Sequence, residues 1–493
     1  MDRSTFAGIL PYQGAVRALL FTCVAVVAFS ASAQERYGIA HSNFGGTDIA
    51  YLNPARTAGQ WPYADIRIAG ADAFAWNSLV AWSDRDQSLV GELRDRSTST
   101  TPGRVVLRSS DLARTHRATV QAAVLGPAVS LALGRGTIGL GIRSRAHVSA
   151  SGVSEELGNF IYQGFNYAPQ VGVRYRDQGV RVLGAAWTEF SANYAHIIRA
   201  EGFSFISVGV GMRYNLGHSA GAFQFTDLDY TVVDTAQLII HEATARYGVA
   251  QPAVRAGSGW GADLGMVYER TLDEADGYFP HQGASGCTPM RYRYRIGVSL
   301  IDLGGIRFRN AEAGTISAGS LTIPDHEHIP VQGVSDLDSL LSTTTQWSRS
   351  TEFAIGLPTA ISLQYDQRIV DHAYIAFAAV QNLAGRSSLR LRRANSLAIT
   401  PRFETRYFEA ALPVVLHEYA ITRPSIGFML RLNGLVIGSD HILPFVSKAD
   451  VYALDVYARL RIMLFRSPAC KGKRSSKKHR SGSKDMVPCV FPK

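Results

Sequence analysis

Apolar and polar residues alternate with a period of two along most of the chain, in segments of roughly ten residues. The alternation is cleanest in Phe203–Leu216, 261–270, Arg291–Ile301 and Leu397–Tyr407. Successive side chains of a β-strand point to opposite faces of the sheet, so this pattern predicts strands with two different faces. We therefore expect an all-β protein.

The less apolar face indicates which kind of β-protein this is. In Phe203–Leu216 one face carries Val208 and Met212, whereas the other carries Gly209 and Arg213. A face of Gly, Ser, Arg, Asp and Glu is typical of a polar lumen, and aromatic residues at strand ends are typical of an interfacial girdle. The pattern predicts a transmembrane antiparallel β-barrel of about 14–16 strands, with a soluble secreted β-protein as the alternative.

The connections are expected to alternate between tight turns on the periplasmic side and long external loops. Glu155–Gly164 is predicted to contain a short helix, and Ala236–Tyr247 fits a helix almost as well as a strand. The predicted turns are Gly134–Thr137, Arg176–Gly179 and Asp302–Gly305, and the predicted long connections are 78–117, 151–167, 271–289 and 318–350.

The N-terminus has the features of a secretory signal peptide. Arg3 and Arg17 precede the apolar run Ala18–Phe29, and Ala31–Ala33 supplies the small residues of a cleavage site. We expect cleavage after Ala33 and export to the outer membrane of a Gram-negative cell. The apolar run is too short for a membrane-spanning helix.

The predicted organisation is a signal peptide (1–33), a plug-like N-terminal segment (34–62), a barrel (63–465) and a disordered basic tail (466–493). The tail carries +8 of the formal net charge of +10, which leaves the mature body almost neutral. The sequence thus lacks the basic folded face that nucleic-acid binding needs. We place the tail in the periplasm and the plug motif at Asn53, Pro54 and Ala55.

The cysteines and histidines predict no metal site or cofactor. Cys470 and Cys489 flank the basic tail and could form a disulfide in the oxidising periplasm, which leaves Cys287 odd. His326 and His328 are two residues apart, but they belong to a long predicted loop without a third histidine nearby. No nucleophile-elbow motif is present, so we predict no catalytic residues and no enzymatic activity.

Charged residues on the predicted inner face are the candidate functional set. They are interpreted as ion pairs that hold a plug or stiffen the wall, with an anion-favouring conduit as the alternative. Arg174 and Arg176 are also assigned to this face. The main lumen-lining candidates are Arg213, Asp263, Glu269, Arg293, Arg295, Arg402, Glu404, Arg406, Arg459 and Arg461.

Four local patterns occur in a characteristic order: Tyr51–Ala55, Gly257–Glu269, Gly297–Gly304 and Ile437–Asp440. Together they resemble an uncharacterised family of Bacteroidota outer-membrane barrels allied to the fatty-acid transporter FadL and the type IX secretion protein PorV. The resemblance covers most of residues 40–465. The tail beyond Phe465 departs from it, and no residue set matches a fatty-acid pocket.

The resemblance implies an outer-membrane transporter or channel for small molecules, hydrophobic ones among them. The alternative is an accessory barrel of protein secretion or surface presentation. The implied partners are outer-membrane lipid, the barrel-insertion machinery, and either a small hydrophobic ligand or a secreted protein, but no nucleic acid.

Overall fold

The structure, a computed structural model, describes residues 36–83, 104–107, 115–163, 168–234, 237–282, 286–323, 345–385, 388–446 and 450–470. The predicted signal peptide, the histidine pair at 326 and 328, and nearly all of the predicted basic tail lie outside these residues. None of the described helices is long and apolar enough to cross a membrane.

The described strands other than β2 (Val80–Ser83) and β3 (Arg104–Leu107) form one closed antiparallel barrel of 14 strands, which confirms the predicted fold class. Closure comes from β1, which pairs with β4 on one side and with β21 on the other. Nine strands are uninterrupted: β1 (Ala64–Asn77), β4 (His116–Leu133), β5 (Gly136–Val153), β6 (Arg174–Glu201), β7 (Ser204–Val232), β14 (Ala373–Asn382), β15 (Ser396–Glu404), β20 (Leu435–Ser439) and β21 (Ala453–Leu464).

Five further strands are each built from two consecutive segments in line. They are β8 (Leu238–Ala250) with β9 (Gly257–Thr271), β10 (Tyr292–Ala318) with β11 (Leu321–Ile323), β12 (Thr345–Gly356) with β13 (Ala360–Val370), β16 (Phe408–Ala411) with β17 (Val414–His417), and β18 (Ser425–Ile426) with β19 (Phe428–Leu432). The segment Ala236–Tyr247 is therefore mainly strand rather than helix.

The outward face carries the apolar side chains, as the alternation predicts. Met212 is 55% exposed and Leu264 is 50% exposed, whereas Arg213 and Asp263 beside them are buried. A closed barrel satisfies its backbone hydrogen bonds internally, and an apolar exterior suits it to lipid. The structure therefore describes a transmembrane barrel.

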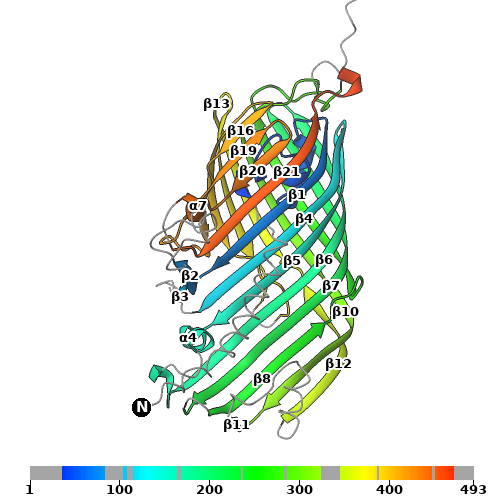
Figure 1. The fold of residues 1–493 in the computed structure, drawn as a ribbon. Helices are drawn as coiled ribbons and strands as arrows, with labels where there is room; N and C mark the ends of the chain where they lie inside the picture. Colours follow the sequence, from blue (N-terminus) through cyan, green and yellow to red (C-terminus); the bar gives the residue numbers. More distant parts are fainter. Residues whose placement is uncertain are drawn as a thin grey trace, which may run out of the picture.

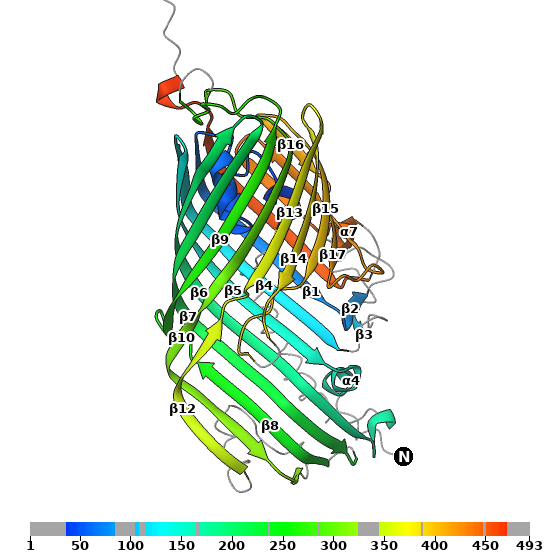
Figure 2. The same cartoon turned by 180° about the vertical axis from the view of Figure 1, so that it is seen from behind.

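The barrel walls differ in height. Strands β6, β7 and β10, with the segments β8 and β12, extend well beyond the other strands at the end away from the tight turns (Figures 1 and 2). The helices α4 (Glu155–Gln163) and α7 (Leu443–Val446), the short helix η4 (Ala168–Gln170) and a small sheet of β2 (Val80–Ser83) and β3 (Arg104–Leu107) lie towards that loop end.

A short N-terminal segment lies inside the barrel near the tight turns, and we call it the plug. It contains α2 (Tyr37–Ala40), η1 (Gly46–Tyr51) and η2 (Pro54–Gly59), and most of its residues are buried. The C-terminal helix η6 (Pro468–Cys470) lies at the same end of the barrel (Figure 1).

Two predicted turns are wrong. Arg176–Gly179 lies within β6, and Asp302–Gly305 lies within β10. Gly179 and Asp302 have positive φ, and the register shifts between Leu300 and Leu303. The same residue types favour turns and β-bulges, and here the neighbouring strands keep the chain extended. The turn at Gly134–Thr137 and the helix at Glu155–Gly164 are confirmed.

One connection lies at the opposite end from that predicted. The segment 271–289 follows β9 and precedes β10, so it belongs to the end with the tight turns at Gly134 and Gly202. The number of strands that precede a connection determines at which end of the barrel the connection lies. The length of the connection alone is a poor guide to that end.

Candidate functional site

The plug is seated on the wall by its Asn-Pro-Ala motif. Asn53 is extended at the start of η2, accepts a hydrogen bond from the Ala55 N–H at 3.0 Å, and donates from Nδ2 to the backbone carbonyl of Met266 at 3.2 Å. Pro54 favours this geometry because it restricts the preceding residue to extended conformations.

Three glycines of the wall make room for that motif. A Cβ atom at Gly265 would lie 2.1 Å from Asn53 Oδ1, one at Gly297 would lie 2.9 Å from Asn53 Nδ2, and one at Gly209 would lie 2.4 Å from the Ala55 nitrogen. The motif thus occupies a socket built from β7, β9 and β10. At Gly209 the two backbones approach closely, and at Gly265 and Gly297 the Asn53 side chain occupies the space that a Cβ atom would need.

A buried ion cluster holds the plug against β1 and β21. Asp48 of η1 accepts from Arg67 at 3.1 Å and from Arg459 at 3.2 Å, and Arg461 donates to Asp65 at 2.9 Å. Burial alone would raise the pKa of Asp48, but the guanidinium groups of Arg459 and Arg67 outweigh it and hold that pKa well below its ordinary range. Asp48 therefore stays ionised inside the barrel.

A second cluster holds the first turns of the plug on the other side. Arg295 donates to Glu269 at 2.7 Å and to Asn43 of the plug at 3.0 Å, and the Asn43 N–H donates to Glu404 at 3.2 Å. Arg402 completes the cluster by donating to the Asp366 carboxylate at 2.8 Å.

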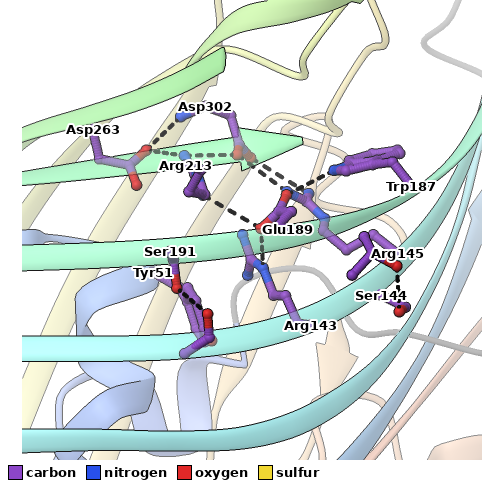
Figure 3. Close-up of polar contacts among 12 residues, drawn as sticks. Tyr51, Arg143, Ser144, Arg145, Trp187, Glu189, Ser191, Arg213, Asp263 and Asp302 are labelled. Carbon is purple, nitrogen blue, oxygen red and sulfur yellow. Dashed lines mark hydrogen bonds and ion pairs between the residues drawn. The ribbon is translucent and has the colours of Figure 1, made fainter. Parts of the chain in front are cut away.

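A third cluster lies deeper in the barrel and contacts Tyr51 of the plug (Figure 3). Arg145 bridges Glu189 at 3.0 Å and Asp302 at 3.1 Å, and Arg213 also reaches Asp302 at 3.1 Å. The other members are Arg143, which pairs with Glu189 and lies 4.0 Å from the centroid of the Tyr51 ring, and Asp263, which pairs with Arg213.

A loop segment enters the barrel from the opposite end and reaches the same cluster. This strap, residues 388–395, adds a main-chain hydrogen bond from Leu391 to Gly356 and an ion pair from Arg393 to Asp302. Leu391 also joins a buried apolar cluster with Trp187 and Phe308, directly beyond the ion cluster.

A pocket lies between the plug and the wall strands β4–β7. Tyr51 and Thr57 line it from the plug, while the wall contributes little side-chain bulk at this level. Ser191 and Asn193 of β6 are only half-buried here. The inner surface of the wall consists mainly of Ala128, Ser130, Gly139, Gly141, Ser191, Asn193 and Gly211, with Arg213 and Asp263 at the end nearest the third cluster.

Two predicted lumen residues do not line the lumen. Arg293 is exposed because the register shifts between Tyr292 and Tyr294, so Tyr292 points inward instead. Arg406 is exposed between β15 and β16, where its guanidinium carbon lies 4.1 Å from the centroid of the Phe465 ring.

Arg174 and Arg176 are also exposed, on the outer face of β6, and pair there with aspartates of β7. Their assignment to the inner face is therefore wrong. Both arginines lie an even number of residues from Val182 and Phe190, whose side chains are exposed, so the regular alternation of β6 places them on the outer face. Buried inside the barrel are Arg213, Asp263, Glu269, Arg295, Arg402, Glu404, Arg459 and Arg461.

The residues that join these arginines into clusters lie mostly outside the alternating segments. Asp302 belongs to a predicted turn, and Asp48 and Tyr51 belong to a plug without strand alternation. Glu189 follows the inward phase of β6 and could have been found from it. Arg393 belongs to a loop in which arginines alternate with leucines, a pattern that is unusual for a solvated loop.

The pairing of cysteines also differs from the prediction. Cys287 forms a disulfide with Cys470 across a sequence separation of 183 residues. Cys470 therefore does not pair with Cys489. Because the segment 271–289 lies at the tight-turn end, it comes close to the chain that follows β21.

Solved structures that resemble this chain include a hydrocarbon channel, a toluene transporter and a FadL homologue. They include the TodX deltaS2S3 mutant monoaromatic hydrocarbon channel (9% identity, 85% of this chain and 95% of that chain covered, TM-score 0.39). Another is the Ralstonia pickettii toluene transporter TbuX, with 11% identity, 85% of this chain and 94% of that chain covered, and a TM-score of 0.38. A Pseudomonas aeruginosa FadL homologue has 11% identity, 84% of this chain and 92% of that chain covered, and a TM-score of 0.34. Likeness at this level carries no argument about the cargo of this chain.

No curated protein matches the chain. A family model does match, over residues 54–440, from the plug motif through β20 to Asp440, and so covers most of the barrel. The chain belongs to the family of unknown function DUF5723.

Proposed function

We propose that this protein is an outer-membrane transporter or channel for small molecules and that its cargo passes the plug through the pocket between the plug and β4–β7. The observation that carries the proposal is the asymmetry of the plug's surroundings. Buried ion pairs join the plug to β1 and β21 and a buried hydrogen bond joins it to β10, whereas the wall opposite Tyr51 presents Gly139, Gly141 and Gly211.

The interior supports a cargo with an apolar part. On the loop side of the third cluster, Trp187, Phe308 and Leu391 are almost completely buried within the barrel. A molecule that enters from the loop end would meet this apolar cluster first, then the ion pairs around Asp302, and then the pocket. An aromatic or aliphatic small molecule with one polar group fits this order of surfaces.

Two closures would have to move during passage. The strap is tied to the third cluster through Arg393, so it closes the pocket towards the loop end. The ion pairs of that cluster are arranged around Asp302, which contacts three arginines. Movement of the strap would therefore redistribute these charges and open the way to Tyr51.

The test compares two tryptophan substitutions one residue apart on β5. Gly141→Trp fills the pocket, whereas Leu140→Trp places the same side chain outside, where Leu140 is 55% exposed. The variants are reconstituted in liposomes, and a panel of small aromatic and aliphatic solutes is added outside. We expect uptake of the solutes to fall for Gly141→Trp and to persist for Leu140→Trp. Equal uptake by both variants would contradict a route through this pocket.

A further inference from the structure

The segment between β9 and β10 forms a cap over the tight-turn end of the barrel. Its described residues are 272–282 and 286–291. The Ala275 N–H donates to the carbonyl of Gly202 at 2.6 Å, and the Gly202 N–H donates to Asp276 at 3.0 Å. The ring of Phe279 lies 4.9 Å from the guanidinium carbon of Arg135. The cap therefore lies across the β4–β5 and β6–β7 turns.

The cap lies next to one end of the pocket. Along the inner face of β6, Ser191 and Asn193 line the pocket and are half-buried. The next inward residues, Ala195 and Ile197, are fully buried in one cluster with Tyr278 of the cap. The pocket thus ends where the cap begins, and its periplasmic end would open if the cap moved away.

A chain of polar contacts joins the cap to the pocket. His281 of the cap lies 3.4 Å from the carbonyl oxygen of Gln60, which directly follows the plug. The Ser130 hydroxyl, which lines the pocket, donates to the Gln60 side chain at 2.8 Å. The cap, the plug and the wall therefore meet at one position.

The cap is joined covalently to the C-terminal segment by the Cys287–Cys470 disulfide. Both cysteines are only half-buried, so a small thiol can approach the sulfur atoms. The Ser467 hydroxyl also donates to the carbonyl of His281. Since η6 follows β21 directly, the disulfide connects the cap to the strand that closes the barrel.

We propose that Cys287–Cys470 is a thiol–disulfide exchange site and that its reduction releases the cap from the pocket. The regulatory part of this inference rests on the proposed function. A thiolate of an external dithiol attacks one sulfur and forms a mixed disulfide, while the other cysteine leaves as a thiolate and takes up a proton. The second thiol of the reagent then attacks the mixed disulfide. The reagent becomes a disulfide and both cysteines become thiols.

The first test measures the cap itself, independently of transport. Hydrogen exchange of the full-length protein in detergent is followed in peptides that cover 272–291, with and without dithiothreitol. We expect exchange in these peptides to rise several-fold on reduction and to be equally fast in Cys470→Ser without dithiothreitol. Cys489→Ser is the matched control and should behave as the wild-type protein does.

The second test measures solute uptake by the same variants in liposomes. We expect uptake to increase several-fold in Cys470→Ser and in reduced wild-type protein. If hydrogen exchange at 272–291 is unchanged after reduction, the disulfide does not hold the cap and the proposal is overturned. If hydrogen exchange becomes faster but solute uptake is unchanged, while Gly141→Trp does block uptake, the cap is not the closure of the pocket. Faster exchange in a barrel that transports no solute would leave the exchange site standing and remove the proposed function.

Discussion

Two regions of the barrel differ in what each strand face contacts. One is the half next to the tight turns, and the other is the extended wall, which is the part of β6, β7, β8, β10 and β12 that reaches beyond the other strands at the loop end. Strands β14 and β21 have 10 and 12 residues, about the length that crosses a bilayer, whereas β6 and β7 have 28 and 29. On the lipid-facing part of β6 the exposed outward residues include Phe190, Tyr194 and Ile198.

Further towards the loop end the outward residues of the long strands become charged. Arg174 and Arg176 pair there with Asp229 and Asp227, and all four belong to the extended wall. Charges on the lipid face are unfavourable within the hydrocarbon region, so this change indicates where the wall leaves the membrane. In the tight-turn half the buried charges point inward, and several of them join the plug to the wall. These ion pairs thus lie on the outer surface of the extended wall, whereas the buried ion pairs of the tight-turn half lie inside the barrel.

The largest expected effect comes from an arginine of the tight-turn half. Arg459→Ala leaves Asp48 and Asp72 buried without this partner, and removal of one partner of a buried ion pair costs about 3–5 kcal/mol. The corresponding change in the extended wall, Arg176→Ala, removes an exposed pair and should change stability little. Urea unfolding in lipid vesicles measures both. Similar losses in the two variants would contradict the contrast.

A smaller effect is expected from charge on the outer face. Leu264→Arg places a cation in the lipid-facing belt, where arginine costs about 2–4 kcal/mol near the bilayer midplane. Ser317→Arg places it on β10 in the extended wall, where we expect no measurable cost. The free energy of folding into vesicles distinguishes them, and equal tolerance would mean that the membrane boundary is misplaced.

The plug socket should be sensitive to a single side chain. Gly265→Val drives a Cβ atom into Asn53, and overpacking of this kind costs about 1–3 kcal/mol. Gly221→Val, on the extended wall, adds its Cβ where no atom lies within 4 Å. Trypsin cleavage at Arg56 reports release of the plug and should accelerate only in the first variant. Gly209→Arg should also displace the plug, because a Cβ atom at Gly209 would lie 2.4 Å from the Ala55 nitrogen.

The smallest effect concerns pH. Asp440 accepts hydrogen bonds from the backbone of Tyr37 and Gly38 at the start of the plug, and burial raises the pKa of Asp440 to about 6. Because the pKa of Asp440 is raised, the folded protein binds this proton more tightly than the unfolded chain does. The proton therefore stabilises the fold at low pH, and this contribution is lost as pH rises through about 6. Thermal unfolding should therefore show slightly lower stability at pH 7 than at pH 5. Asp440→Asn should reduce this difference, and an unchanged difference would assign it to another group.

The sequence by itself determined the fold class and most of the strand phase. Period-two alternation is a local property, and it correctly places Val208 and Leu264 outside and Arg213 and Asp263 inside. The alternation also held for Arg295, Arg402 and Arg459. It failed at Arg293 and Arg406, where a register shift and a turn interrupt the two-residue period.

Only the tertiary structure decided which of these residues meet. Asp302 contacts arginines from β5, β7 and the strap, because inter-strand register and barrel closure bring distant positions together. Cys287 meets Cys470 because an even number of crossings returns the 271–289 segment to the end where β21 finishes. Such contacts depend on the strand count, the bulges and the position of the plug, and these are properties of the closed barrel rather than of any one segment.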